Sequence, residues 1–150
     1  MIEESGVTID APADHVWRVF TDVERWPEWT ASVTRAEVVG GGGAGLRVGT
    51  AVRIKQPRFP AITWVVTELD PGVSWTWVAR SPGATTVAVH EIEPLDAGTT
   101  RVRQRIEQTG PIGALVGRAI RATTRRYLAT EAAGLKRRCE ATRDAGAPGA

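Results

Sequence analysis

The chain is 150 residues long, 42% hydrophobic and 24% charged, which is ordinary for a folded protein and excludes a mainly disordered one. The length suits a single domain, and no internal repeat is visible. The formal net charge of +2 excludes a strongly basic protein. The basic residues that gather late in the chain are interpreted as a solvated helix face rather than a site for an anionic surface or nucleic acid.

The first part of the chain predicts one strand and two short helices. Alternating apolar residues indicate a strand over 3–9. Asp10 is a candidate N-cap and Pro12 a candidate first residue for a helix over 12–20. A second, shorter helix follows, and Pro27 interrupts it.

Six further strands are predicted, over 32–39, 48–55, 62–69, 73–80, 85–93 and 99–108. The glycine-rich run over 40–45 is interpreted as a flexible turn rather than a phosphate-binding loop, because no Lys-Ser or Lys-Thr pair follows it. The sequence Asp-Pro-Gly over 70–72 is typical of a tight turn. Consecutive hairpins predict an antiparallel sheet, and the separate helices give an α+β class.

The pairing of the last two strands decides which polar side chains face inward. Arginines occupy alternate positions in the final strand, at 101, 103 and 105, and must face water. Gln104 therefore faces inward. If Ile92 lies opposite Val102, His90 lies opposite Gln104 on the same inner face.

The last segment predicts one long helix from Pro111 to about Glu140, with proline at the first helical position. The expected apolar face consists of Ile112, Val116, Ala119, Ile120, Thr123 and Tyr127, and it drifts towards Leu128, Leu135 and Cys139. Three arginines, at 118, 121 and 125, lie on the opposite face. Because only the strands can supply a broad apolar partner, we expect a sheet curled around this helix with a ligand space between them.

Tryptophan is over-represented in this chain, with six residues against two Phe and one Tyr. Trp75 and Trp77 are two positions apart in a strand, so both point to one face. We expect the ligand space to be walled by Trp64, Trp75, Trp77, Val52, Ile54, Ile62, Val66, Ile92, Val102, Ile106, Val116, Ile120 and Thr123. Such walls favour an aromatic or polycyclic ligand, driven by burial of apolar surface.

A catalytic hypothesis assigns three polar residues to this space. His90 acts as general acid or base, Gln104 orients it, and Tyr127 polarises a carbonyl group. Glu131 is a further inward-facing candidate. The alternative is that His90 is a wall residue that hydrogen-bonds to Gln104 and takes no part in chemistry.

No metal site or cofactor is expected, because the chain has two histidines, one cysteine and no clustered carboxylates at ligand spacing. His15 is expected to be exposed on the first helix. Cys139 cannot form an internal disulfide and is interpreted as a small packing residue.

Five stretches of the sequence resemble the SRPBCC superfamily, the START-related helix-grip proteins. They are APADHVWRVFTDVERWPEW at 11–29, the glycine at 49, VTELDPG at 66–72, GTTRV at 98–102, and a terminal helix that ends in LKRRCE. The resemblance covers residues 3–140 and is strongest for the polyketide cyclase/dehydrase and lipid-transport branch. It implies a seven-stranded antiparallel sheet that grips the C-terminal helix around a hydrophobic cavity. No shared catalytic motif can be carried over, so the site residues above come from the strand and helix patterns alone.

The resulting hypothesis is one domain over 1–140 with a disordered tail over 141–150. It binds a hydrophobic small molecule, and polyketide-type cyclisation or dehydration is its enzymatic version. The alternatives are a non-catalytic lipid or hydrophobic-ligand carrier, and an adaptor or oligomer subunit that uses the Trp26-Pro27-Glu28-Trp29 corner as a surface anchor. We expect a cytoplasmic monomer or homodimer that binds no nucleic acid and does not insert stably into membranes, because no signal sequence or long apolar run is present.

Overall fold

The computed structural model describes residues 1–43 and 45–144. In chain order its elements are β1 (Ile2–Ile9), α1 (Ala13–Thr21), η1 (Val23–Glu28), β2 (Arg35–Val38), β3 (Ala51–Lys55), β4 (Ile62–Asp70), β5 (Ser74–Ser81), β6 (Ala84–Asp96), β7 (Thr99–Thr109) and α2 (Pro111–Thr142).

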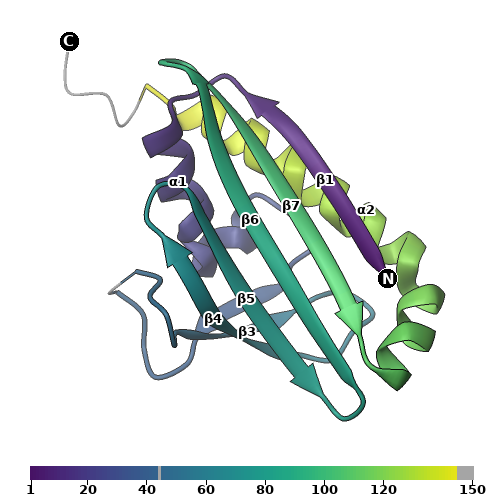
Figure 1. Ribbon diagram of the computed structural model, residues 1–150. Coiled ribbons are helices and arrows are strands. Elements are labelled where there is room, and N and C mark those ends of the chain that lie inside the picture. The colour runs from purple at the N-terminus through teal and green to yellow at the C-terminus, as the bar shows by residue number, and fades with distance from the viewer. Residues whose placement is uncertain (44, 145–150) are drawn as a thin grey trace.

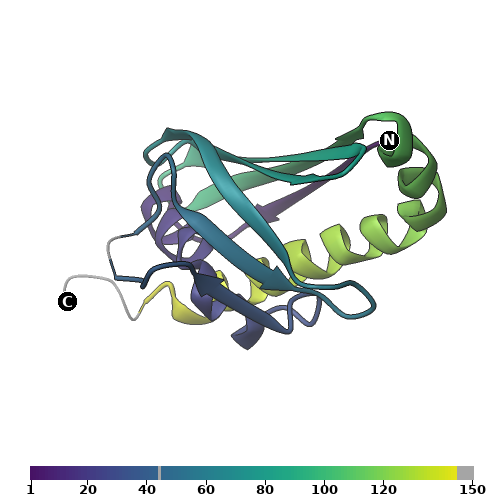
Figure 2. The same ribbon diagram turned by 90° about the horizontal axis from the view of Figure 1, so that it is seen from below.

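The seven strands form one antiparallel sheet in the order β1-β7-β6-β5-β4-β3-β2 (Figure 1). The sheet is strongly curled, and α1, η1 and α2 all lie on its concave side (Figure 2). This arrangement is the α+β helix-grip fold, as the sequence predicts. The predicted pairing of the last hairpin is also confirmed, because His90 lies opposite Gln104 and Ile92 opposite Val102.

The face that α2 turns to the sheet differs from the predicted one. Its buried residues are Gly113, Gly117, Thr124, Leu128, Glu131, Ala132, Gly134, Leu135 and Cys139. The predicted stripe was wrong in the first half of the helix, where Ile112, Val116 and Ala119 are exposed. Glycines without side chains let the helix approach the sheet more closely there than a larger residue would allow. The helix runs through residue 142, two positions into the expected tail, and residues 145–150 of that tail lie outside the described part.

The start of α1 also differs from the prediction. Pro12 takes the N-cap position, and no side chain caps this helix end. The backbone N–H of Asp10 instead donates to Glu140 Oε2 at 2.9 Å, and the carbonyl of Asp10 accepts from Arg143 Nη1 at 2.9 Å. His15 is buried rather than exposed, and its Nε2 lies 2.9 Å from the Thr142 hydroxyl oxygen. The beginning of α1 is thus tied to the end of α2.

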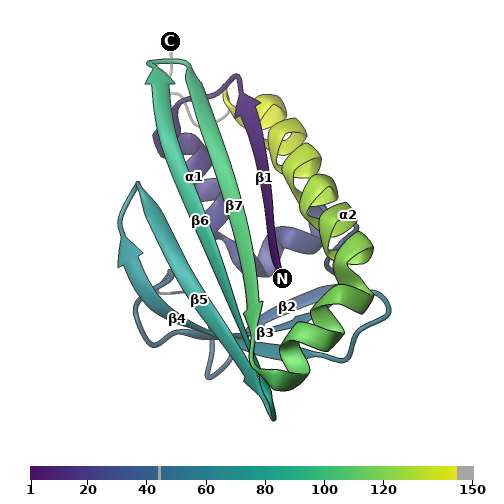
Figure 3. The ribbon, with the colours of Figure 1, turned by 45° about the vertical axis from the view of Figure 1, so that its right-hand side comes forward.

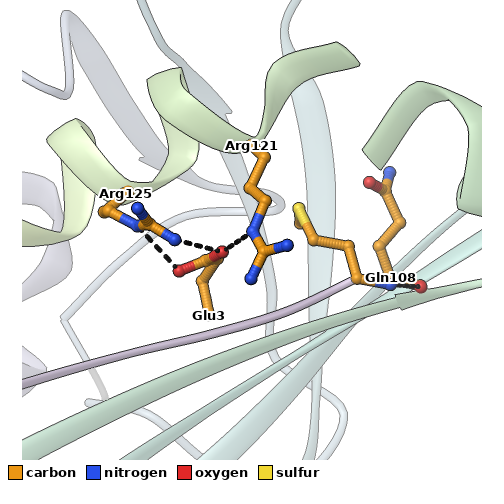
Figure 4. A network of polar contacts seen from close by, with 5 residues as sticks. Glu3, Gln108, Arg121 and Arg125 are labelled. Carbon is orange, nitrogen blue, oxygen red and sulfur yellow. Dashed lines mark hydrogen bonds and ion pairs between the residues drawn. The ribbon is translucent and has the colours of Figure 1, made fainter. Parts of the chain in front are cut away.

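The middle of α2 is attached to β1 by an ion-pair network (Figure 4). Glu3 on β1 accepts hydrogen bonds from both Arg121 and Arg125, with 3.1 Å between Arg125 Nε and Glu3 Oε2. The Glu3 side chain is 7% exposed, and the two arginines cover it while keeping contact with water. The hydrogen bonds from Arg125 and then Arg121 hold the pKa of Glu3 below its usual value.

The core lies at the end of the sheet beneath α1 and η1. Phe20, Trp26 and Trp75 are fully or almost fully buried there, and the Phe20 ring contacts both indoles. Trp26 Nε1 donates to the carbonyl oxygen of Phe20 at 2.9 Å, which satisfies its polar atom. Because Trp26 and Trp29 are both buried, the Trp26–Trp29 corner is core packing, and the hypothesis that it forms a surface anchor is wrong.

The contact between Gly134 and Trp29 gives a stability prediction. A Cβ atom added at Gly134 would lie 2.0 Å from the backbone oxygen of Trp29, whereas one at Gly113 would come no closer than 3.3 Å to any neighbour, the nearest being Ala84 Cβ. Gly134→Ala should therefore lower the free energy of unfolding by about 2 kcal/mol despite the better helix propensity of alanine. Gly113→Ala, in the same helix, is the matched control and should change it by less than about 1 kcal/mol. Urea unfolding of both variants measures the difference, and equal stability of the two would contradict the packing described.

Candidate functional site

Two adjoining cavities lie between the concave face of the sheet and α2. Their volumes are about 50 Å³ and about 100 Å³. The residues that line both are Gln56, Trp64, Ile106, Leu128 and Glu131. The smaller cavity adds Trp77, His90 and Gln104 from the sheet, and the larger adds Thr124 and Tyr127 from the helix. Together they form one apolar space interrupted by a few polar groups.

This space is smaller than the sequence led us to expect. Sites for drug-sized ligands commonly enclose roughly 300–1,000 Å³. Aromatic rings fill the inner end of the fold, where the Trp75 indole stacks on the His90 imidazole with ring centres 4.1 Å apart. Phe20 packs against the same indole at 4.7 Å. The interior therefore has room for a small aryl group in its present form, and a polycyclic ligand requires it to widen.

The predicted wall residues fall into three groups. Those that line a cavity are Ile54, Ile62, Trp64, Trp77, Ile106 and Ile120. Those packed in the core, away from both cavities, are Val52, Val66, Trp75, Ile92 and Val102. Val116 is exposed, and Thr123 lies outside both linings, where its neighbour Thr124 takes the position. The helix residues were misplaced because the predicted apolar stripe was rotated away from the true buried face.

His90 is a neutral residue of the cavity wall. Its Nδ1 donates to the backbone carbonyl of Trp75 at 3.3 Å, so its described partner is not Gln104. Burial lowers the pKa of His90 to about 3, and the hydrogen bond to Trp75 offsets only part of this effect. A group with this pKa is unprotonated and only weakly basic near neutral pH, which argues against the predicted role of His90 as general acid or base.

Glu131 is the titratable group that the structure brings into both cavities. Its residue exposure is 7%, and it lines both cavities together with Trp64, Ile106 and Leu128. Burial raises the pKa of Glu131 to about 8, although contacts from Gln104 and Ser32 favour the ionised form. At neutral pH the group is therefore mainly a protonated carboxylic acid, which can donate a hydrogen bond or a proton to a ligand.

Ser32 and Thr30 support this carboxyl group from the segment after η1. Both are buried, and their hydroxyl oxygens are 2.7 Å apart. The Thr30 hydroxyl oxygen also accepts from the backbone N–H of Ser32 at 3.3 Å. The Ser32 side chain, which contacts Glu131, is therefore held in place by Thr30.

A segment between β3 and β4, residues 56–61, contributes Gln56 and Phe59 to the wall of the larger cavity; we call it the strap. The Tyr127 hydroxyl donates to the carbonyl oxygen of Pro57, and the Tyr127 and Phe59 rings meet edge to face at 5.9 Å. Lys55 Nζ donates to the strap carbonyl of Gln56 at 2.7 Å and also to that of Phe59. Tyr127 therefore fastens the strap to α2, and its hydroxyl is not free to polarise a ligand carbonyl as predicted.

A larger hollow lies elsewhere on the described surface. It is an open cleft of about 890 Å³ between α1 and the glycine-rich loop. Its acidic side chains, Asp22 and Glu24, are exposed and engaged in local contacts with Arg25 and the Val38 N–H. The buried acid and the indole walls make the interior cavities the better candidate site. Among residues 1–43 and 45–144 there is no group of three or more His, Cys, Asp or Glu side chains that could hold a metal ion.

Comparison with known proteins gives one family match that spans nearly the whole chain. The family described as polyketide cyclase / dehydrase and lipid transport matches residues 2–140. A protein of Streptomyces halstedii that is named as a candidate polyketide cyclase is 30% identical over 93 residues, which cover 60% of this chain and 72% of that protein.

Solved structures with aromatase/cyclase names share the fold. The Zhui aromatase/cyclase from Streptomyces sp. R1128 superimposes with a TM-score of 0.78 at 20% identity and covers 99% of both chains. The di-domain aromatase/cyclase BexL from the BE-7585A biosynthetic pathway gives a TM-score of 0.69 at 25% identity. That match covers 95% of this chain but 47% of BexL, so the chain spans about half the length of the di-domain protein.

The raised pKa of Glu131 predicts a specific pH dependence of stability. The folded state holds this proton more tightly than the unfolded chain, so the contribution is complete below the usual pKa of 4.5 and is lost as pH rises to about 8. His90, whose pKa is lowered, acts in the opposite direction between about 3 and 6.5. The effect of Glu131 should therefore be clearest above pH 6.5.

Glu131→Gln replaces the acid with a neutral side chain of similar shape and should remove this dependence. We expect the free energy of unfolding of the variant, relative to the wild type, to rise by on the order of 3 kcal/mol between pH 5 and pH 8.5. The exposed Glu68→Gln is the matched control and should show no such rise. Parallel pH profiles for wild type and Glu131→Gln would mean that Glu131 titrates normally.

Proposed function

Because the chain belongs to the polyketide cyclase/dehydrase and lipid transport family, we propose that it binds an aromatic ketone between the sheet and α2 and promotes polyketide-type cyclisation or dehydration, with Glu131 as the acid. The supporting observation is a carboxylic acid that burial keeps protonated, placed on the wall of an otherwise apolar space. Trp64 and Trp77 lie on the same wall and offer flat surfaces for an aromatic ligand.

The acid can serve both steps of such a reaction. In cyclisation, a carbon–carbon bond forms between an enol carbon and a ketone carbon, and Glu131 gives its proton to the ketone oxygen. The enol O–H proton then returns to the carboxylate. In dehydration, the carbon–oxygen bond of the resulting alcohol breaks as Glu131 protonates the departing hydroxyl, and water leaves. The carboxylate recovers a proton from the adjacent C–H, so no external oxidant or reductant is needed.

Gln104 supports this role by its contact with the Glu131 carboxyl group and by its position opposite His90. The contact keeps the pKa of Glu131 lower than burial alone would, so that the acid can both lose and regain a proton. We assign His90 to the wall, where its stacking on Trp75 shapes the inner end of the site.

Ligands larger than one aryl ring require the strap to move away from α2. The strap is fastened at one end of the cavity by Tyr127, whereas α2 is anchored to α1 at the other end by His15 and Thr142. Opening at the strap would therefore widen the space without disturbing the aromatic core. The closed state excludes bulk water from Glu131.

A non-catalytic carrier of hydrophobic ligands is the second candidate. The neutral His90 and the occupied hydroxyl of Tyr127 favour it, because they leave Glu131 as the one acid of the cavity wall within the described residues. A carrier would use Glu131 only to donate a hydrogen bond to a ligand carbonyl. The two functions differ in whether loss of the acid affects turnover or affinity.

Ligand binding can be measured by quenching of tryptophan fluorescence with emodin, a tricyclic aromatic ketone. We expect saturable quenching by the wild type and at least roughly tenfold weaker binding by Ile106→Trp, whose added indole fills space shared by both cavities. Val65→Trp adds the same indole to the outer face of β4 and should bind normally. Equal affinity of both variants would place the ligand outside the cavities.

Catalysis can be tested with 4-hydroxy-4-phenylbutan-2-one, which loses water to give a conjugated enone that absorbs in the near ultraviolet. Glu131→Gln should lower the rate by at least about a hundredfold because the proton donor is lost, while emodin binding persists. Glu68→Gln should leave the rate unchanged. Wild-type binding of emodin without detectable dehydration would favour the carrier function, and an unchanged rate for Glu131→Gln would exclude Glu131 as the acid.

A further inference from the structure

The first turns of α2 expose an apolar face that the fold does not cover. Ile112 is 51% exposed, Leu115 is 73% exposed and Val116 is 39% exposed, and Ala119 lies exposed on the same side. We call these four residues the exposed helix face. It contains three of the six residues of the predicted apolar face, Ile112, Val116 and Ala119, and such exposure is unusual for a helix that packs on a sheet.

The surroundings of this face carry positive charge. No Asp or Glu occurs from residue 109 to residue 130, a stretch that contains four arginines. Arg121 and Arg125 pair with Glu3, but within the described residues Arg118 and Arg126 are exposed and have no ion pair. A partner for this face must therefore offer apolar contact and negative charge together. A second copy of the chain would bring like charges against each other.

The exposed helix face is a convex ridge at one end of the molecule. The helix starts beside the turn between β5 and β6, where the N–H of Ile112 donates to the carbonyl oxygen of Gly83 at 3.0 Å. Figure 3 shows this end of α2 at the edge of the fold, at the opposite end of the sheet from the turn between β6 and β7. A ridge needs a matching groove on a protein partner, whereas a lipid surface can accept it without one.

We propose that the exposed helix face docks on an anionic lipid surface, with its apolar side chains in the interfacial layer and Arg118 and Arg126 near the lipid headgroups. This geometry is that of an amphipathic helix lying on a membrane, held by apolar burial and charge. No helix among the described residues is long and apolar enough to cross a membrane. The following turns of α2, with Ile120 and Tyr127, line the larger cavity, so docking would place that cavity close to the lipid.

Co-sedimentation with lipid vesicles tests this proposal on the full chain. Vesicles of phosphatidylcholine with one quarter phosphatidylglycerol should bind the wild type, and pure phosphatidylcholine vesicles should bind it much less. Arg118→Glu and Leu115→Asp should each weaken binding at least roughly fivefold, since one basic residue near an anionic surface contributes about that factor. High salt should weaken it further.

Leu95→Asp is the matched control, because Leu95 is a 43% exposed leucine near the turn between β6 and β7 at the far end of the sheet. It should bind vesicles like the wild type. Absence of wild-type binding to anionic vesicles, equal binding to both kinds of vesicle, or equal losses in Leu95→Asp and Leu115→Asp would each overturn the proposal. Emodin binding by Leu115→Asp should persist, which separates this test from that of the proposed function.

Discussion

The close approach of α2 to the concave face of the sheet is the constraint on which the remaining structure depends. At the C-terminal end this approach needs Gly134, because the helix backbone passes directly against Trp29. Leu135 and Cys139 are then buried against the core, and the end of α2 is fixed to α1 and β1 by polar contacts. In its middle the helix is attached to β1 through Glu3, and nearer its N-terminal end it meets the sheet through glycines. The unfilled interior space therefore lies along the middle of the helix, beside Glu131.

Two titratable groups in this space respond to one physical cause in opposite directions. Burial penalises the charged form of any group, so it lowers the pKa of His90 and raises that of Glu131. Both side chains are therefore mainly neutral at pH 7, but they differ in what they can do. The imidazole is too weakly basic to hold a proton near neutral pH, whereas the carboxyl group still holds one there. Under the proposed function, the role of proton donor therefore falls to the carboxyl group and not to the imidazole.

Sequence patterns predicted the fold in detail because strands and turns have strong local signals. The alternation in β7 gave the inward direction of Gln104, and the pairing with β6 placed His90 opposite it. The helix was harder, since its buried face is built from Gly113, Gly117 and Thr124, which carry no apolar signal. The sequence does carry a signal for Glu131 as a site residue, because this charged residue lies between Leu128 and Leu135 on one helical stripe. The cavity volume could not be predicted, as it depends on how rings such as Phe20 and Trp75 interlock.

In the first half of α2 small residues face the sheet and apolar side chains face solvent, and the packing of the fold explains this arrangement. Larger side chains on the inner face would collide with Ala84, Gln108 or Met1, so only small residues fit there. The apolar side chains Leu115 and Val116 then have no inner surface to pack on. In solvent these apolar side chains lower the solubility of the protein and add little to the stability of its core. At an anionic lipid interface, the same side chains on a basic helix would gain free energy by burial. The close approach of α2 to the sheet therefore limits the cavity volume and also leaves an amphipathic surface beside the larger cavity. The ligand space and the outer surface both follow from the position of this one helix.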